Sequence, residues 1–220
     1  DGSKIRPDAV FPVIHGSTGE DGVLQGLLEL LELPYAGCGV TASAVCMDKV
    51  ISKELAVLEG APVLPHVVIR AHQRSAMAPL LKKAARLGFP LFVKPVAQGS
   101  SVGVRKVKKP AELRASVSNA FRFDTAVMIE KGVDLAREIV CGVLGSASGA
   151  AASVTGEVVP KGKHEFFDYE AKYLDNSGMD FLLPAPLSAG VEARVRFLAV
   201  KIFLALGCSG LARIDFLLDP

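Results

Sequence analysis

The sequence lacks any run of apolar residues that could cross a membrane. A spanning helix needs about 20 predominantly apolar residues, and no stretch of the 220-residue chain approaches that length. The first residues, Asp1-Gly2-Ser3-Lys4, also lack the apolar core of a signal peptide. We therefore expect a cytoplasmic protein without a membrane partner.

The chain also lacks an excess of charge of either sign. Its 25 lysines and arginines nearly balance its 23 aspartates and glutamates, which leaves a net charge of +2. Binding to nucleic acid or to an anionic membrane generally depends on a marked positive excess. The composition therefore gives no support for a nucleic-acid partner, and any positive charge that matters for function must be local.

Cysteine is scarce and scattered. The four thiols, Cys38, Cys46, Cys141 and Cys208, form no C-x-x-C motif and have no histidine paired with them nearby in the sequence. This pattern argues against a disulfide framework and against a zinc site. We expect reduced and mostly buried thiols.

What the chain does contain is the composition of a folded globular protein, with 50% hydrophobic and 22% charged residues. Such a chain can bury one sizeable core or two small ones. Strand and helix signals alternate throughout, so we predict a mixed α/β or α+β fold in at least two subdomains. We divide it into an N-terminal part at 1–60, a central lobe at 61–135 and a C-terminal lobe at 136–220.

In the N-terminal part, the pattern predicts a short strand at 10–14 and two amphipathic helices. Ser17 and Glu20 have the spacing of a capping box at the start of the first helix. The second helix covers roughly 41–58, and its predicted inward positions are Val45, Ile51, Leu55 and Leu58.

The remainder alternates more regularly. Helices are predicted near 77–87, 110–121 and 190–206, and strands near 63–70, 91–94, 104–107, 126–130, 138–144 and 211–220. Small residues at 145–157 indicate a surface hairpin, and the polar segment 168–181 indicates a long functional loop. Because the last strand stops at a turn signal with no partner strand after it, we expect the chain to be a fragment.

A loop of small residues, Gln98-Gly-Ser-Ser-Val-Gly103, follows an apolar strand that ends in Lys94-Pro95. Its glycines and serines would let phosphate approach the backbone, with amides and hydroxyls as donors. The alternative is an ordinary hairpin turn. Lys94 argues against it, because a lysine that is only solvated gains little from a position at the end of an apolar strand. The loop is not a P-loop, because no Gly-Lys-Ser/Thr follows. Gly37–Ala42 fits a loose dinucleotide fingerprint, which we set aside because a poor strand precedes it.

Several charged residues stand where a ligand site would need them. His15 follows the first predicted strand, Lys49 lies in the second predicted helix, and Glu130-Lys131 and Arg137-Glu138 lie at strand ends. Each position also has a structural explanation. His15 can be a structural histidine, and Lys49 can be a solvated surface lysine. Glu130-Lys131 can be a solvated strand end, and Arg137-Glu138 can belong to an ion pair at a sheet edge.

Two further segments combine unusual residue types. Phe166-Phe-Asp-Tyr-Glu-Ala-Lys-Tyr173 concentrates aromatic, acidic and basic residues ahead of the long loop, a mixture that a structural loop rarely needs. Arg213 and Asp215 share one face of the last strand, because side chains repeat every two residues. They can form an ion pair, or they can hold an oxyanion and Mg²⁺.

The order of these motifs along the chain resembles that of D-alanine–D-alanine ligases. The resemblance covers essentially the whole chain and is most specific in Glu20-Asp-Gly22, Gly99-Ser-Ser-Val-Gly103 and Asp168-Tyr-Glu-Ala-Lys-Tyr173. It implies an ATP-grasp fold, in which two α+β lobes hold ATP between their sheets, together with part of an N-terminal α/β subdomain.

The resemblance also implies roles for individual residues. Those that would bind ATP are Lys49, Lys94, Ser101, Glu130, Lys131, Val133, Glu138, Phe166 and Lys172. Those that would bind substrate are His15, Ser100, Tyr173 and Arg213, of which the last three would be catalytic. Asp215 would bind Mg²⁺, with Mn²⁺ as an alternative ion.

A member of this family would join two D-alanines with ATP for peptidoglycan precursor synthesis, and its full-length form would be a homodimer. We expect this chain by itself to be inactive, because the family's N-terminal glutamate and the last Mg²⁺ ligands after Asp215 lie outside its 220 residues. The alternatives are a D-alanine–D-lactate ligase, another ATP-grasp carboxylate–amine ligase, and a nucleotide-binding module without catalysis.

Overall fold

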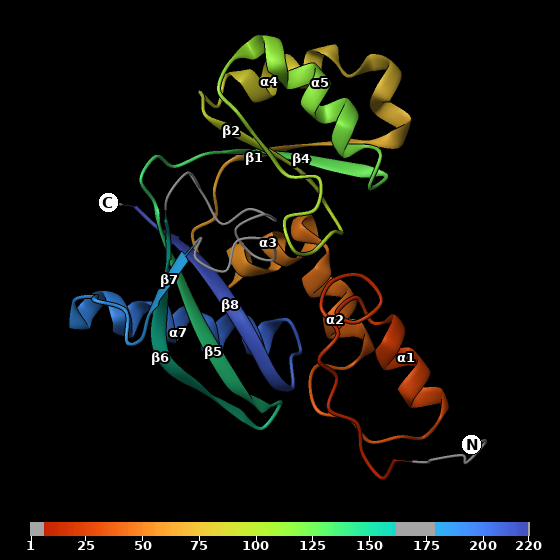
Figure 1. Ribbon diagram of the computed structural model, residues 1–220, viewed down its shortest axis with the longest axis vertical. Helices are drawn as coiled ribbons and strands as arrows, with labels where there is room; N and C mark the ends of the chain where they lie inside the picture. The colour runs from red at the N-terminus through yellow and green to blue at the C-terminus, as the bar shows by residue number, and fades with distance from the viewer. Residues whose placement is uncertain (1–6, 162–178, 220) are drawn as a thin grey trace.

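The computed structural model describes residues 7–161 and 179–219, which form two four-stranded antiparallel sheets with helices packed around them (Figure 1). The helices are α1 (Val23–Leu30), α2 (Val40–Met47), α3 (Lys49–Leu58), the 3₁₀ helix η1 (Ala71–Ala76), α4 (Ala78–Ala85), α5 (Pro110–Ala120) and α7 (Ala189–Ala205). The strands are β1 (His66–Arg70), β2 (Leu91–Pro95), β3 (Arg105–Val107), β4 (Ala126–Lys131), β5 (Arg137–Ser146), β6 (Gly149–Pro160), β7 (Met179–Leu182) and β8 (Gly210–Leu218). The predicted α+β class is confirmed.

The first sheet, of order β1-β4-β2-β3, is covered on one face by α4 and α5 (Figure 1). Ile69, Leu91 and Val117 are fully buried in the core between them. Phe92 pairs with Glu130 across β2 and β4, and both side chains point to the opposite face. Lys94 and Glu130 therefore lie on the side of the sheet away from α4 and α5.

The second sheet, of order β7-β6-β5-β8, packs one face on α7. Its core includes Ile139, Cys141 and Phe203, all nearly or completely buried. Val140 pairs with Asp215 across β5 and β8, which places both on the face away from α7. At 17 residues α7 is the longest described helix, and no described helix is long and apolar enough to cross a membrane.

Helix α3 lies between the two sheets and contacts both lobes (Figure 1). Val50 packs against Met128 of the first sheet. At the other end, Ala56 packs against Ile202 of α7, and Lys201 Nζ donates to the carbonyl oxygen of Glu59 at 2.9 Å. One short helix thereby fixes the relative position of the two lobes.

The predicted strand at 10–14 is wrong. Only Val10 pairs, through an isolated bridge to Tyr35, while Phe11 and Val13 are 73% and 64% exposed. No neighbouring strand in the described part of the chain offers this segment a longer ladder, so its apolar pattern alone does not produce one.

The predicted single helix at 41–58 is two helices separated at Asp48. This residue has extended backbone angles, and its side chain caps α3 by accepting hydrogen bonds from two backbone amides. The break changes which side of the helix faces inward. Ile51 and Leu58 are 44% and 79% exposed, contrary to prediction, whereas Val50 is buried.

The small-residue stretch at 145–157 is a hairpin in part only. After a turn between Ser146 and Gly149, the chain continues as β6, a twelve-residue strand that pairs with both β5 and β7. At Gly156 a Cβ would lie 2.6 Å from Cζ of Phe181. Because Gly156 has no side chain, the ring of Phe181 on β7 can lie against β6.

Candidate functional site

Lys49 is the first residue of α3, and its side chain points at the segment between β2 and the glycine loop. Its Nζ donates to the carbonyl oxygen of Val96 at 3.1 Å and to that of Gln98. Burial, followed by the nearby charge of Lys94, lowers the pKa of Lys49 to about 8. Two cations in a poorly solvated place would both be stabilised by a bound polyphosphate.

Lys94 is held by a buried carboxylate. Glu130, only 3% exposed, contacts Lys94 Nζ through one oxygen and Lys53 Nζ through the other, both at 2.6 Å. Burial opposes ionisation of Glu130, but Lys94 and Lys53 outweigh it and hold its pKa below the usual range. Sequence reasoning missed Lys53. Its position one helical turn after Lys49, on the same side of α3, was the available signal.

The glycine loop between β2 and β3 is a series of tight turns. Ser100, Ser101 and Gly103 all have positive φ, at 51°, 60° and 71°, a region that non-glycine residues rarely adopt. At Gly99 a Cβ would lie 3.1 Å from Cα of Gly16. The loop therefore lies directly against the N-terminal segment, and this close approach depends on glycine.

Gln98 connects the same two segments with its side-chain amide. Its Oε1 accepts from Ser17 Oγ at 3.3 Å, and its Nε2 donates to the carbonyl oxygen of Phe123 at 3.0 Å. The residue before the glycine loop thus joins the N-terminal segment to the turn ahead of β4.

Glu20 orders the N-terminal segment rather than the helix after it, so the predicted capping box is wrong. Its carboxylate accepts from the backbone N–H of Gly16 at 2.5 Å and lies 3.8 Å from His15 Nδ1. Helix α1 begins after Gly22 without a side-chain cap. His15 is thereby placed beside a carboxylate, in the segment that lies against the glycine loop.

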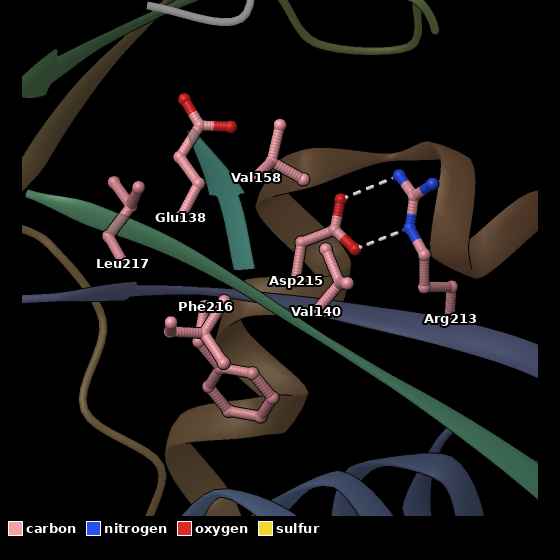
Figure 2. Close-up of a pocket in the computed structure, with 8 residues that line it drawn as sticks. Glu138, Val140, Val158, Arg213, Asp215, Phe216 and Leu217 are labelled. Carbon is pink, nitrogen blue, oxygen red and sulfur yellow. Dashed lines mark hydrogen bonds and ion pairs between the residues drawn. The ribbon is translucent and has the colours of Figure 1, made fainter. Parts of the chain in front are cut away.

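Arg213 and Asp215 form an ion pair on the exposed face of the second sheet (Figure 2). The guanidinium donates to both carboxylate oxygens, at 2.7 and 2.8 Å. The bond to Asp215 raises the pKa of Arg213 against the effect of burial, and the charges of Glu20 and Glu138 add to it. The three carboxylates around this arginine come from three separate segments.

A small pocket of about 80 Å³ opens beside this pair (Figure 2). Glu138, Val140 and Val158 line it with Arg213 and Asp215. An ion pair at a sheet edge was the structural alternative for Arg137-Glu138, but β5 is an inner strand of its sheet. Arg137 instead binds Glu157 on β6 through two hydrogen bonds at 2.8 and 2.6 Å, which leaves Glu138 on the pocket face.

Lys131 and Glu130 are neighbours on β4 whose side chains lie on opposite faces of the sheet. Lys131 pairs with Leu91 in the sheet register, which places its side chain on the other face from Glu130, and a Cβ at Gly88 would lie 3.1 Å from its Nζ. Val133 is half-buried in the connection from β4 to β5. Phe166, Lys172 and Tyr173 lie outside the described residues, as does most of the predicted loop at 168–181.

The side chains fit a nucleotide polyphosphate with its metal ion. Lys49 and Lys94 bring positive charge to the end of β2 ahead of the glycine loop, and phosphate oxygens require such local charge. Within residues 7–161 and 179–219 no cluster of three His, Cys, Asp or Glu side chains could hold a metal by itself. Mg²⁺ bound to nucleotides takes one or two carboxylates and phosphate oxygens, and Asp215 offers such a carboxylate.

Two α+β lobes, with Lys94 on the first sheet and the Arg213–Asp215 pair on the second, have the architecture of the ATP-grasp class of proteins. Solved structures support this class. The chain superposes with a TM-score of 0.84 on the VanG D-Ala:D-Ser ligase from Enterococcus faecalis, at 40% identity over 98% of this chain and 61% of that one. It superposes with a TM-score of 0.79 on the D-alanine-D-alanine ligase from Coxiella burnetii, at 36% identity over 97% and 55%.

Residues 55–220 match the family described as D-ala D-ala ligase C-terminus, and residues 1–38 match the family described as D-ala D-ala ligase N-terminus. The chain is 49% identical over 219 residues to D-alanine--D-alanine ligase A from Bradyrhizobium diazoefficiens, which covers 99% of this chain and 58% of that protein. It is 47% identical over 212 residues to D-alanine--D-alanine ligase from a Thermoanaerobacter species, covering 96% and 58%. The chain belongs to the D-alanine–D-alanine ligase family, and it spans 58% of the length of these two relatives.

Proposed function

We propose that the complete gene product is a cytoplasmic enzyme that joins two D-alanines with ATP, for peptidoglycan precursor synthesis. One observation carries the proposal beyond family membership. Lys49, Lys94 and the Gly99–Gly103 loop converge with the His15 segment at the inner face of the first sheet. In this proposal Lys49, Lys94 and the loop would bind phosphate next to a segment that would hold the amino acid.

The proposed chemistry has two steps. A carboxylate oxygen of the first D-alanine attacks the γ-phosphorus of ATP, and ADP leaves. The amine of the second D-alanine then attacks the acyl carbon, loses a proton, and phosphate leaves. Both steps develop negative charge on oxygen, which preorganised cations stabilise most effectively. Among the described residues, Lys49, Lys94 and Arg213 would supply such cations.

The remaining roles complete this proposal. His15 would hold the first D-alanine, and Ser100 would position substrate together with Tyr173. Ser101 and Lys172 would bind phosphate, and Asp215 would hold Mg²⁺, which neutralises phosphate charge when bound, with Mn²⁺ as a substitute.

The adenosine part of ATP would lie along the connection between the lobes. Lys131 and Val133 would contact adenine at the end of β4, Phe166 would lie beside the ring, and Glu138 would accept from the ribose. The carboxylate of Glu130 is shared by two lysines, so its part would be to position Lys94. We also propose the division at 1–60, 61–135 and 136–220, since each of the last two ranges contains one complete sheet.

The test is phosphate release by the complete gene product with ATP, Mg²⁺ and D-alanine. We expect turnover that requires D-alanine and yields the dipeptide. ATP hydrolysis that is indifferent to D-alanine, or no turnover at all, would contradict the proposal. Retained ATP binding without dipeptide would favour the reading of a nucleotide-binding module.

A second substrate other than D-alanine is a specific alternative, because one similar solved structure is named a D-Ala:D-Ser ligase. Incubation with equimolar D-alanine, D-serine and D-lactate followed by mass analysis separates these activities. We expect D-alanyl-D-alanine as the main product. We also expect a homodimer by sedimentation of the complete gene product, and a monomer would contradict this part of the proposal.

A further inference from the structure

Three of the four cysteines lie together where the N-terminal segment meets the second lobe. Cys38 precedes α2, Cys46 lies in the last turn of α2, and Cys208 follows α7. The Sγ atoms of Cys46 and Cys208 are 3.7 Å apart, and the thiol of Cys38 lies near enough to Cys208 to affect the pKa of both. The fourth thiol, Cys141, is buried in the second sheet and contacts backbone carbonyls there.

The backbone at this junction is closely packed, which keeps the thiols in contact. Ser209 Oγ donates to the carbonyl oxygen of Gly37 at 3.0 Å. At Gly210 a Cβ would lie 2.6 Å from the nitrogen of Gly37. The amide of Cys208 donates to the carbonyl oxygen of Phe203 at 3.0 Å, which fixes the turn after α7. The two segments cannot separate without breaking these contacts.

The thiols differ in access and acidity. Cys46 is exposed, whereas Cys208 is only 4% exposed. Hydrogen bonds from Cys208 lower the pKa of Cys38 to about 6 and lower that of Cys46, while the same two bonds raise the pKa of Cys208. The exposed thiol of Cys46 therefore ionises more readily than an ordinary cysteine, and it lies against a buried thiol that ionises less readily. An exposed thiolate with a neighbouring thiol is the arrangement that favours disulfide formation over further oxidation.

We propose that Cys46 and Cys208 form a reversible disulfide that links α2 to the segment before β8. The oxidant is a peroxide. The Cys46 thiolate attacks one peroxide oxygen, the O–O bond breaks, and sulfenic acid and water form after protonation. The Cys208 sulfur then attacks the sulfenic sulfur, the S–O bond breaks, and a second water leaves with the proton of Cys208. Two thiols are oxidised by two electrons and one peroxide is reduced.

The position of this bond gives it a structural consequence. Cys46 lies three residues before Lys49, and Cys208 lies five residues before Arg213. The disulfide would tie together two segments 162 residues apart in the sequence, and closing a long loop restricts the unfolded chain. This inference concerns the chain itself and does not depend on the proposed ligase activity.

The test is mass spectrometry of the complete gene product after titration with hydrogen peroxide, alkylation of remaining thiols and non-reducing digestion. We expect a peptide pair linked through Cys46 and Cys208 that dithiothreitol separates. We also expect a higher Tm for the oxidised protein, which the reductant reverses. The linked pair should persist in Cys38→Ser and Cys141→Ser and disappear in Cys46→Ser, an exposed position whose substitution does not disturb the core.

Three results would overturn the proposal. One is a link between Cys38 and Cys208 in place of the expected one. Another is sulfinic acid on Cys46 with no linked peptide at any peroxide concentration. The third is a link only between separate chains, recognised because its yield rises with protein concentration.

Discussion

Lys49 and Lys94 differ in the groups that their ammonium nitrogens contact. Both lysines lie on the inner side of the first sheet, and only Lys94 has a carboxylate bound directly to its Nζ, that of Glu130. Lys94 can be replaced to test its role without disturbing the apolar core, because its side chain lies on the face of the sheet away from α4 and α5. The glycine loop beside it then loses one of its cations.

Replacing Lys94 by alanine should lower kcat/KM of the complete gene product by on the order of 10²–10³, the typical loss when one charge-stabilising group is removed. The measurement is D-alanine-dependent phosphate release. Lys83→Ala is the matched control, because this lysine is exposed on α4 at the outer side of the sheet, and it should leave the rate unchanged. Equal losses in both variants would refute the phosphate role of Lys94.

The lowered pKa of Lys49 predicts a pH dependence of stability. The folded-state pKa is about 8 and the ordinary value is 10.5, so between these pH values the unfolded chain binds more protons than the folded one. The free energy of unfolding should therefore rise with pH across this window through the Lys49 contribution. Urea unfolding of the wild-type protein and Lys49→Met at pH 7, 8, 9 and 10 isolates that contribution.

In that comparison we expect Lys49→Met to be more stable than wild type at pH 7, with the difference narrowing as the pH rises. Other groups that titrate in the same range affect both proteins and cancel in the difference. A difference that stays constant from pH 7 to pH 10 would show that the ammonium group carries no burial penalty.

At the scale of elements, the chain changes direction at Asp48, and that single residue separates α2 from α3. Its carboxylate accepts from the amides of Val50 and Ile51 at 2.8 and 3.0 Å. Lys49 is the first residue of α3, so the capped first turn of this helix also sets the position of Lys49. Local capping chemistry thus decides the position of a functional side chain.

Asp48→Ala should lower the free energy of unfolding by about 1 kcal/mol, the usual cost of losing an N-cap. Asp48→Asn is the control, since its amide oxygen can accept the same two bonds and should keep most of the stability. Chemical denaturation of the complete gene product measures both. If Asn were as damaging as Ala, charge rather than capping would explain the loss.

The contact between the glycine loop and the N-terminal segment is a second element-scale feature. Gly99→Ala would place a methyl group 3.1 Å from Cα of Gly16, so the two segments would have to move apart. We expect kcat/KM to fall about tenfold or more, because small displacements of reacting groups are costly. Gly190→Ala, where no atom lies within 4 Å of the new Cβ, should retain wild-type activity in the same assay.

At the scale of the whole molecule, the contact of α3 with α7 attaches the second lobe to the helix that also packs on the first sheet. Ile202 is 8% exposed and packs with Ala56, Ala61 and Leu198 in this contact. The contact joins residues of the N-terminal part to the second lobe, so its loss should affect the molecule as a unit.

Ile202→Ala should lower the free energy of unfolding by about 2–4 kcal/mol, as for other large-to-small changes in a core. Leu204→Ala, on a side chain that is 42% exposed, should cost clearly less. Guanidinium unfolding gives both values. Equal costs would mean that the interface between α3 and α7 is no better packed than the helix surface.

The sequence by itself determined most elements of the two lobes, their α+β class and the family. Helices α4, α5 and α7 and strands β2, β4, β5 and β8 lie where periodicity and turn residues predicted them, because these signals act over a few neighbouring residues. The motif order from His15 to Asp215 is likewise a property of the chain alone.

Only the tertiary structure decided which side chains meet. Glu130 binds Lys53 as well as Lys94, and Cys46 contacts Cys208. It also decided that the segment at 10–14 forms no strand, because a strand needs a partner and not only an apolar pattern. Each of these outcomes depends on the packing of segments far apart in the sequence, which neither propensity nor spacing encodes.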